Sequence, residues 1–168
     1  MGPPDSKWPP QRLAVSEVME PPKRTARHEA LEAFVGRWKA SGTSYGDNGA
    51  SSSKGADETP WESIYTARWH DGRFFVVQDE HANGPFDPLS ILGWDEQASA
   101  YFAIVFENHG FVRKYVVDAQ GNVWTFSGLH ERARVEFSDD GMTQTIRWEL
   151  KRGDTWGPLC DRVARKIA

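Results

Sequence analysis

The sequence predicts an all-β protein, an antiparallel up-and-down β-barrel of about ten strands with a short N-terminal helix that closes one end. Three observations predict this fold. After residue 36 nearly every segment reads as a strand, turn signals separate the segments at regular spacing, and eight Trp, nine Phe and four Tyr provide large side chains suited to a barrel interior. We favour a barrel over the alternative, a two-sheet sandwich, because closure removes the sheet edges that would otherwise aggregate.

The N-terminal part divides into a tail and a helix. Residues 1–24 contain three Pro-Pro pairs and little apolar periodicity, which is typical of a disordered tail. The domain is therefore expected over residues 25–168. Thr25 can cap a short helix that carries Leu31, Phe34 and Val35 on one face and ends at Gly36, and this helix is short enough to plug the barrel.

The strands follow in order from Arg37. Asp-Gly pairs at 71–72 and 140–141 favour tight hairpins, because both central residues of a type I′ turn need positive φ. We expect strands over residues 37–45, 61–70, 73–81, 89–95, 101–107, 111–118, 122–129, 131–138, 142–151 and 154–164.

The loops of such a meander alternate between the two ends of the barrel. One end receives the tight turns at 71–72, 95–100, 119–121 and 139–141. The other end receives the longer or more polar connections at 46–59, 83–88, 107–110, 129–131 and 152–154. Long loops at one end predict an open mouth there.

Composition excludes several classes of partner. The net charge of −4 disfavours nucleic acid, which requires a concentrated basic face. No segment approaches the roughly 20 apolar residues of a membrane span. Cys160 is the only cysteine, so no intrachain disulfide forms; we expect it in the core and the protein in the cytoplasm. We expect neither a metal nor another cofactor.

The side chains on the inner face of the second and third strands predict a pocket. If Asp71 and Gly72 form a two-residue turn, one face carries the cross-strand pairs Trp69 with Phe74, Ala67 with Val76, Tyr65 with Gln78 and Ser63 with Glu80. The other face carries Glu62, Thr66, Arg68, Asp79 and His81 and is expected outside, although a one-residue slip would exchange the faces. The inner face then offers aromatic walls with a few polar groups, as small-molecule pockets do.

The candidate site residues come from several strands. The expected ligand-binding residues are Tyr65, Trp69, Gln78, Glu80, Phe86, Phe106, Arg113, Tyr115 and Trp148. Arg113 could bind an anionic or carbonyl group or pair with a surface acid. The candidates for proton transfer are Tyr65, Glu80, His81 and His109. Histidines and glutamates near the mouth could hold a metal, but they lack the fixed short spacing of a metal motif.

The motifs of the chain resemble a known family. Residues 34–38, Phe-Val-Gly-Arg-Trp, resemble the Gly-x-Trp start of lipocalin-like and calycin proteins. Residues 69–78, 84–86 and 92–95 and Tyr101 resemble, in the same order and at similar spacing, the bacterial family called domain of unknown function 1579, over roughly residues 28–166. That resemblance implies a calycin-like barrel without a known activity.

The resemblance also implies a structural role for Trp38. In related barrels this Trp lies over the closed end and packs on a basic side chain of the last strand, which here would be Arg162 or Arg165. The chain also resembles the haem-binding nitrobindin group in its Gly-x-Trp start and length. That group takes its proximal His from late in the chain, and no His follows His130 here, which argues against haem.

Two functions are consistent with these features. The first is a protein that holds a small apolar or aromatic molecule in the barrel, with a homodimer as a further expectation. The second is an enzyme of isomerase or cyclase type that uses the same cavity for acid/base chemistry. A purely structural module with a filled barrel is the third reading, and the volume of the interior would separate it from the other two.

Overall fold

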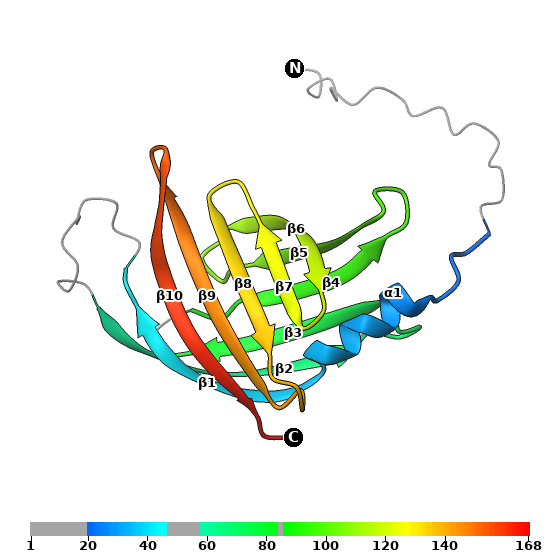
Figure 1. Cartoon of the computed structure of the whole chain (residues 1–168), viewed down its shortest axis with the longest axis horizontal. Helices are drawn as coiled ribbons and strands as arrows, with labels where there is room; N and C mark the ends of the chain where they lie inside the picture. Colours follow the sequence, from blue (N-terminus) through cyan, green and yellow to red (C-terminus); the bar gives the residue numbers. More distant parts are fainter. Residues whose placement is uncertain (1–19, 47–57, 84–85) are drawn as a thin grey trace, which may run out of the picture.

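The computed structural model describes residues 20–46, 58–83 and 86–168. Ten antiparallel strands form one closed sheet, in which each strand pairs with its neighbours in sequence and β1 pairs with β10 (Figure 1). The predicted fold class is confirmed. The strands are β1 (Gly36–Ser44), β2 (Thr59–Trp69), β3 (Phe75–Ala82), β4 (Leu89–Asp95), β5 (Ala100–Phe106), β6 (Val112–Gln120), β7 (Val123–Ser127), β8 (Glu131–Phe137), β9 (Thr143–Arg152) and β10 (Thr155–Lys166).

Some predicted features lie outside the described residues. These are the tail up to residue 19, most of the loop predicted over 46–59, and the first two residues of the motif at 84–86. Arg24, the last residue of the predicted tail, packs on the barrel, where its Nε donates a hydrogen bond to the carbonyl oxygen of Arg73 at 2.9 Å.

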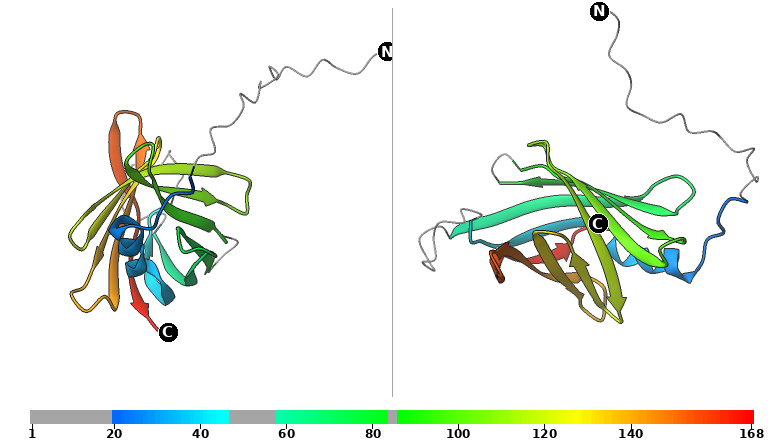
Figure 2. Two further views of the ribbon diagram at one scale, coloured as in Figure 1. Left: turned by 90° about the vertical axis from the view of Figure 1, so that its right-hand side faces the viewer. Right: turned by 90° about the horizontal axis from the view of Figure 1, so that it is seen from above.

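A short helical segment covers one end of the barrel, as Figure 2 shows from two sides. It consists of α1 (Ala26–Glu29) and a 3₁₀ turn (Ala30–Phe34). Thr25 is its N-cap residue, as predicted, and forms a capping box with the buried His28, whose Nδ1 accepts a hydrogen bond from the Thr25 backbone N–H at 3.1 Å. Leu31 and Phe34 are buried, and the Phe34 ring packs edge-on against Trp124, Phe126 and Phe137. In the described part of the chain, no helix has the length and apolarity to cross a membrane.

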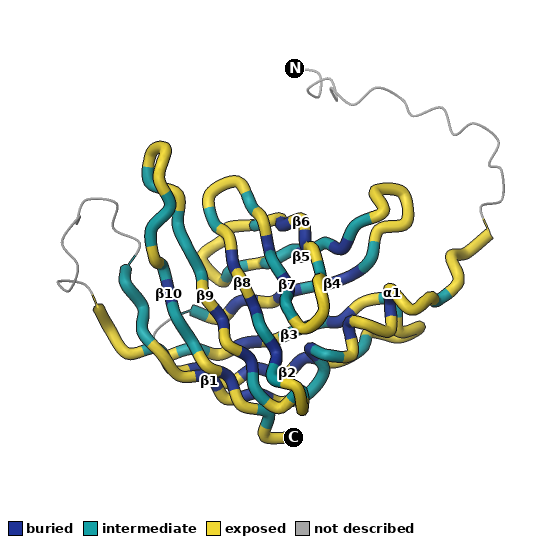
Figure 3. Tube along the Cα trace, viewed as in Figure 1, coloured by how far each residue is buried: buried dark blue, intermediate teal, exposed yellow. Residues whose placement is uncertain are grey.

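Side chains alternate between the interior and the outside along each strand, which Figure 3 shows as alternating buried and exposed positions. Small inward residues lie among the aromatic ones; Ala40, Ala67, Ala103, Ala133 and Ala164 are all buried. Small residues leave room for large rings on facing strands, as in other small barrels.

The β2–β3 turn is longer than the sequence predicts. Trp69 pairs with Val76, Ala67 with Gln78 and Tyr65 with Glu80, so the predicted pairs are wrong by two residues. The loop contains four residues rather than two, because His70 pairs with Phe75 through a 2.8 Å backbone hydrogen bond and Arg73 adopts φ 58°. A shift by two residues leaves every side chain on its predicted face.

Trp38 lies at the closed end, fully buried, and its Nε1 donates to the carbonyl oxygen of Phe34 at 2.9 Å. The basic partner is Lys166, whose Nζ lies 5.2 Å from the centre of the indole, and not Arg162 or Arg165. Lys166 is the register partner of Trp38 on β10, whereas Arg165 is exposed and Arg162 lies farther along the strand towards the mouth.

Candidate functional site

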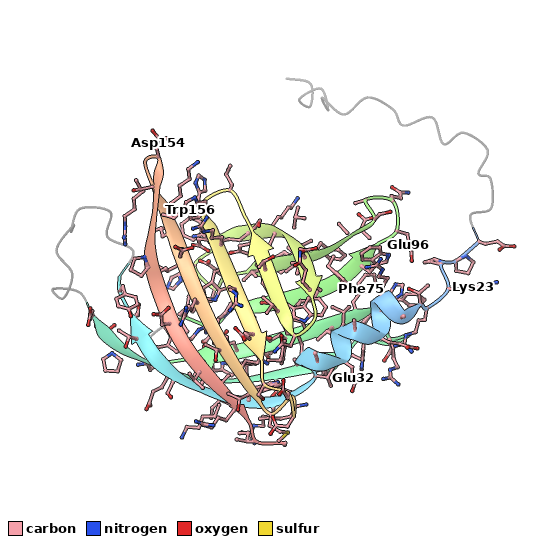
Figure 4. The ribbon with its side chains drawn as sticks, viewed as in Figure 1. Lys23, Glu32, Phe75, Glu96, Asp154 and Trp156 are labelled. Carbon is pink, nitrogen blue, oxygen red and sulfur yellow. The ribbon has the colours of Figure 1, made fainter. Side chains whose placement is uncertain are left out.

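The open half of the barrel is hollow. Its outer chamber has a volume of about 570 Å³ and opens between loops at the end opposite the helix. Residues from four of the five connections predicted at the mouth line it, namely Gly46, Phe86, Glu107, His109 and Glu131. The fifth, the β9–β10 hairpin with Asp154 at its tip (Figure 4), lies beside them, since Arg152 Nη2 donates to the Gly46 carbonyl at 3.3 Å. The predicted mouth is therefore correctly placed.

A smaller inner chamber of about 70 Å³ lies deeper in the barrel. The residues that line both chambers are Gln78, Glu80, Ser90, Val105, Tyr115, Trp148 and Arg162. The other walls of the inner chamber are mainly apolar and include Phe34, Leu92, Phe126 and Ile146. The interior is thus filled near the helix and open towards the loops.

An ion pair lies where the two chambers meet. Arg162 Nη1 donates to Glu80 Oε1 at 2.8 Å, and the two side chains are 10% and 6% exposed. The guanidinium also lies 4.6 Å from the centre of the Trp61 ring. Arg162 reaches Glu80 beside Gly42, its register partner on β1, which presents no side chain in between. The pair leaves little net charge at this depth.

Tyr65 and Gln144 form the polar part of the inner chamber. The Tyr65 hydroxyl donates to Gln144 Oε1 at 2.9 Å. Burial raises the pKa of the Tyr65 phenol well above its usual range, with Glu80 adding to the rise and Arg162 opposing it. Tyr65 is therefore a neutral hydrogen-bond donor at physiological pH.

A second charged cluster lines the mouth. Arg113 Nε lies 2.7 Å from Glu107 Oε1 and 3.4 Å from Glu131 Oε1. The Tyr115 hydroxyl donates to Glu131 Oε2 at 2.8 Å, and burial, together with Glu131, raises the pKa of that phenol well above its usual range. One guanidinium faces two carboxylates, so this cluster is net negative.

Most of the predicted ligand-binding residues line the cavity. They are Tyr65, Gln78, Glu80, Phe86, Arg113, Tyr115 and Trp148. Arg113 pairs with Glu107 and Glu131, which are 11% and 13% exposed and line the mouth rather than the outer surface. Its predicted role in binding an anionic or carbonyl group stays a prediction.

Two predicted ligand-binding residues lie elsewhere. Trp69 is at the closed end, where its Nε1 donates to Glu32 Oε2 at 2.6 Å and Arg24 and Arg73 flank its ring; Figure 4 shows Glu32 on the helical segment. Trp69 therefore attaches the helix to β2. Phe106 is 41% exposed and faces outside, because its neighbour Val105 occupies the inward position.

The proton-transfer candidates are not gathered at one point. Tyr65 and Glu80 are cross-strand partners inside the barrel, and His109 lines the mouth. His81 lies on the outer face, where it contacts Asp87 at 3.2 Å, because it follows the inward Glu80 by one residue. Among residues 20–46, 58–83 and 86–168, no group of three His, Cys, Asp or Glu side chains is placed to hold a metal ion.

Several cavity residues were missed by sequence reasoning. Gln144, Ser90, Trp61 and Cys160 line the chambers, and Cys160 is buried as predicted. Gln144 precedes the inward Trp148 by four residues on β9, so strand alternation places it inside. A polar residue on this otherwise apolar face was the available signal.

Comparisons with known proteins support the fold. No family model matches the chain, and no curated protein matches it. Membership of domain of unknown function 1579 thus stays a prediction from its motifs. Among solved structures, the barrel is similar to the crystal structure of Rv2717c from M. tuberculosis, with a TM-score of 0.64 and 9% sequence identity. The match covers 87% of this chain and 100% of that one, and at this identity it shows a shared fold alone.

Proposed function

We propose that the protein binds a small, mainly apolar or aromatic molecule inside the barrel. The observation that carries this proposal is the outer chamber of about 570 Å³, which falls within the size range of known small-molecule sites. Trp61, Phe86, Phe111, Tyr115 and Trp148 supply aromatic walls for it. Flat rings on several sides favour a ligand with an apolar body.

Binding is better supported than acid/base catalysis. The Tyr65 phenol is held protonated by burial, and the Glu80 carboxylate is engaged by Arg162 at 2.8 Å. A general base needs an available lone pair within reach of the substrate, so Tyr65 and Glu80 are poorly suited to that role, and His109, which lines the mouth, is the remaining candidate inside the cavity. Orientation of a bound molecule requires only the donors and rings that the cavity supplies.

The first experiment is native mass spectrometry of gently purified full-length chain, followed by denaturing analysis of any species that dissociates. We expect a reproducible organic molecule at one equivalent per chain. Its mass would give the chemical class directly.

A titration tests the cavity with a defined probe, N-phenyl-1-naphthylamine, whose fluorescence rises in apolar surroundings. The Val105→Phe variant places extra volume in the chamber, so we expect probe affinity to fall at least about tenfold. Ile104→Phe is the matched control, because Ile104 adjoins Val105 on β5 and does not line either chamber. The proposal would be contradicted if the purified chain carried no bound molecule and did not raise the fluorescence of N-phenyl-1-naphthylamine.

A further inference from the structure

The inner chamber contains hydrogen-bond donors that lack acceptors. Gln144 is 3% exposed and lines this chamber, yet its Nε2 has no hydrogen-bond partner in the described part of the chain. The same holds for Nε of Arg162. Buried donors in native proteins are nearly always paired, and an unpaired one is destabilising. These atoms are therefore suited to meet an acceptor from outside the chain.

The two ends of the Gln144 amide differ in their partners. The Tyr65 hydroxyl donates to Oε1 at 2.9 Å, so the oxygen end of the amide is satisfied. The Tyr65 ring is held in turn by stacking on Trp38, with ring centres 6.2 Å apart. The nitrogen end is left as the free donor.

The size of the inner chamber limits what it accepts. A volume of about 70 Å³ holds a few water molecules or a small group such as a carbonyl with its methyl. It does not hold an aromatic ring, which the outer chamber accommodates. A ligand that reaches Gln144 would therefore do so with a small terminal group.

The charges around the cavity favour a neutral acceptor over an anion. Arg162 is already paired with Glu80, so a ligand carboxylate would meet the Glu80 charge as well. At the mouth, Glu107 and Glu131 outnumber Arg113, and an entering anion would be repelled there too. A ketone, aldehyde or amide oxygen avoids both costs.

We propose that the ligand is a neutral, mainly apolar molecule with a terminal carbonyl-type acceptor, whose oxygen enters the inner chamber and accepts a hydrogen bond from Gln144 Nε2. This inference rests on the proposed binding function and adds the polar group that the cavity selects. The apolar body of the ligand occupies the outer chamber against Tyr115 and Trp148.

The test compares two probes of nearly equal shape, 2-acetonaphthone and 2-ethylnaphthalene, which differ by a carbonyl in place of a methylene. Each probe is titrated against the chain loaded with N-phenyl-1-naphthylamine, and the loss of fluorescence gives its affinity. We expect the affinity ratio of ketone to hydrocarbon to fall about tenfold in Gln144→Leu, the value of one hydrogen bond. Thr145→Val, at the exposed neighbouring position on β9, should leave the ratio unchanged.

Two further measurements keep the test decisive. Gln144→Met is a second apolar variant in case Gln144→Leu does not fold, and cooperative unfolding verifies each variant. Infrared spectroscopy of 2-acetonaphthone bound to the unaltered chain should show the carbonyl stretch below its frequency in hydrocarbon solvent.

The outcomes separate the two proposals. If both probes bind but the ratio is the same in every folded variant and the carbonyl band is unshifted, the acceptor inference is overturned and the binding function stands. If neither probe displaces N-phenyl-1-naphthylamine and native mass spectrometry finds no bound molecule, both proposals fail together.

Discussion

At the scale of single residues, neighbouring side chains have opposite roles because the strand alternates. Glu80 enters the cavity and pairs with Arg162, whereas His81, one residue on, contacts Asp87 on the outer face. Val105 and Phe106 divide in the same way. Residue type alone, such as a histidine or a phenylalanine near the mouth, therefore does not identify a site residue.

Cys160 provides a prediction at this scale. Its side chain is buried, and burial raises the pKa of the thiol to about 11, with Glu80 and Asp161 adding to the rise and Arg162 opposing it. Only the thiolate reacts, so alkylation by iodoacetamide at pH 8 should be at least about 100-fold slower in the folded chain than in urea. The folded rate should keep rising with pH towards about 11.

The chain contains one cysteine, so the urea-unfolded protein is its own reference for this measurement. Cys160 also lines the outer chamber, and a bound ligand should slow the reaction further. A folded-state rate that levels off near pH 9 would show an ordinary thiol and contradict the expected shift.

At the scale of elements, the length of a turn decides which residues pair across two strands, whereas alternation along each strand decides which side chains point into the barrel. The four-residue β2–β3 loop moves each pair by two positions, and Tyr65 and Glu80 still point inward. Both described non-glycine residues with positive φ, Arg73 and Ser99, lie in such hairpin turns. Those positions carry backbone strain that a glycine would relieve.

Ser99 tests this strain. It is exposed in the β4–β5 turn with φ 50°, so Ser99→Gly should stabilise the chain by about 0.5–1 kcal/mol, because the relieved left-handed strain exceeds the entropic cost of glycine. Urea denaturation measures the change. Ser41→Gly, at an exposed position within β1, should instead destabilise the chain. Equal effects at both positions would contradict the assigned backbone conformation.

At the scale of the whole molecule, the Glu80–Arg162 pair joins β3 and β10 across β1 and β2. A double-mutant cycle measures its contribution to stability. Arg162→Met leaves a buried carboxylate unpaired and should cost about 3–5 kcal/mol. Adding Glu80→Leu should recover most of this loss, because two well-packed apolar residues replace a buried ion pair at little cost.

The exposed Arg132–Glu149 pair is the matched control for that cycle. It joins β8 and β9 on the outer face, where solvent screens the charges, so Arg132→Met should change the free energy of unfolding by less than about 1 kcal/mol. Similar losses for Arg162→Met and Arg132→Met would show that burial does not govern the inner pair.

The sequence by itself determined the features that depend on neighbours along the chain. Strand positions, the helix with Leu31 and Phe34 inward, the facing of Tyr65 and Glu80 and the end of the barrel that opens all follow from alternation and turn residues. Only the tertiary structure decided which side chains meet across the barrel. Lys166 rather than Arg162 covers Trp38, Arg162 is paired with Glu80, and Gln144 retains a free donor, because these contacts depend on strand register and on how completely the rings fill the interior.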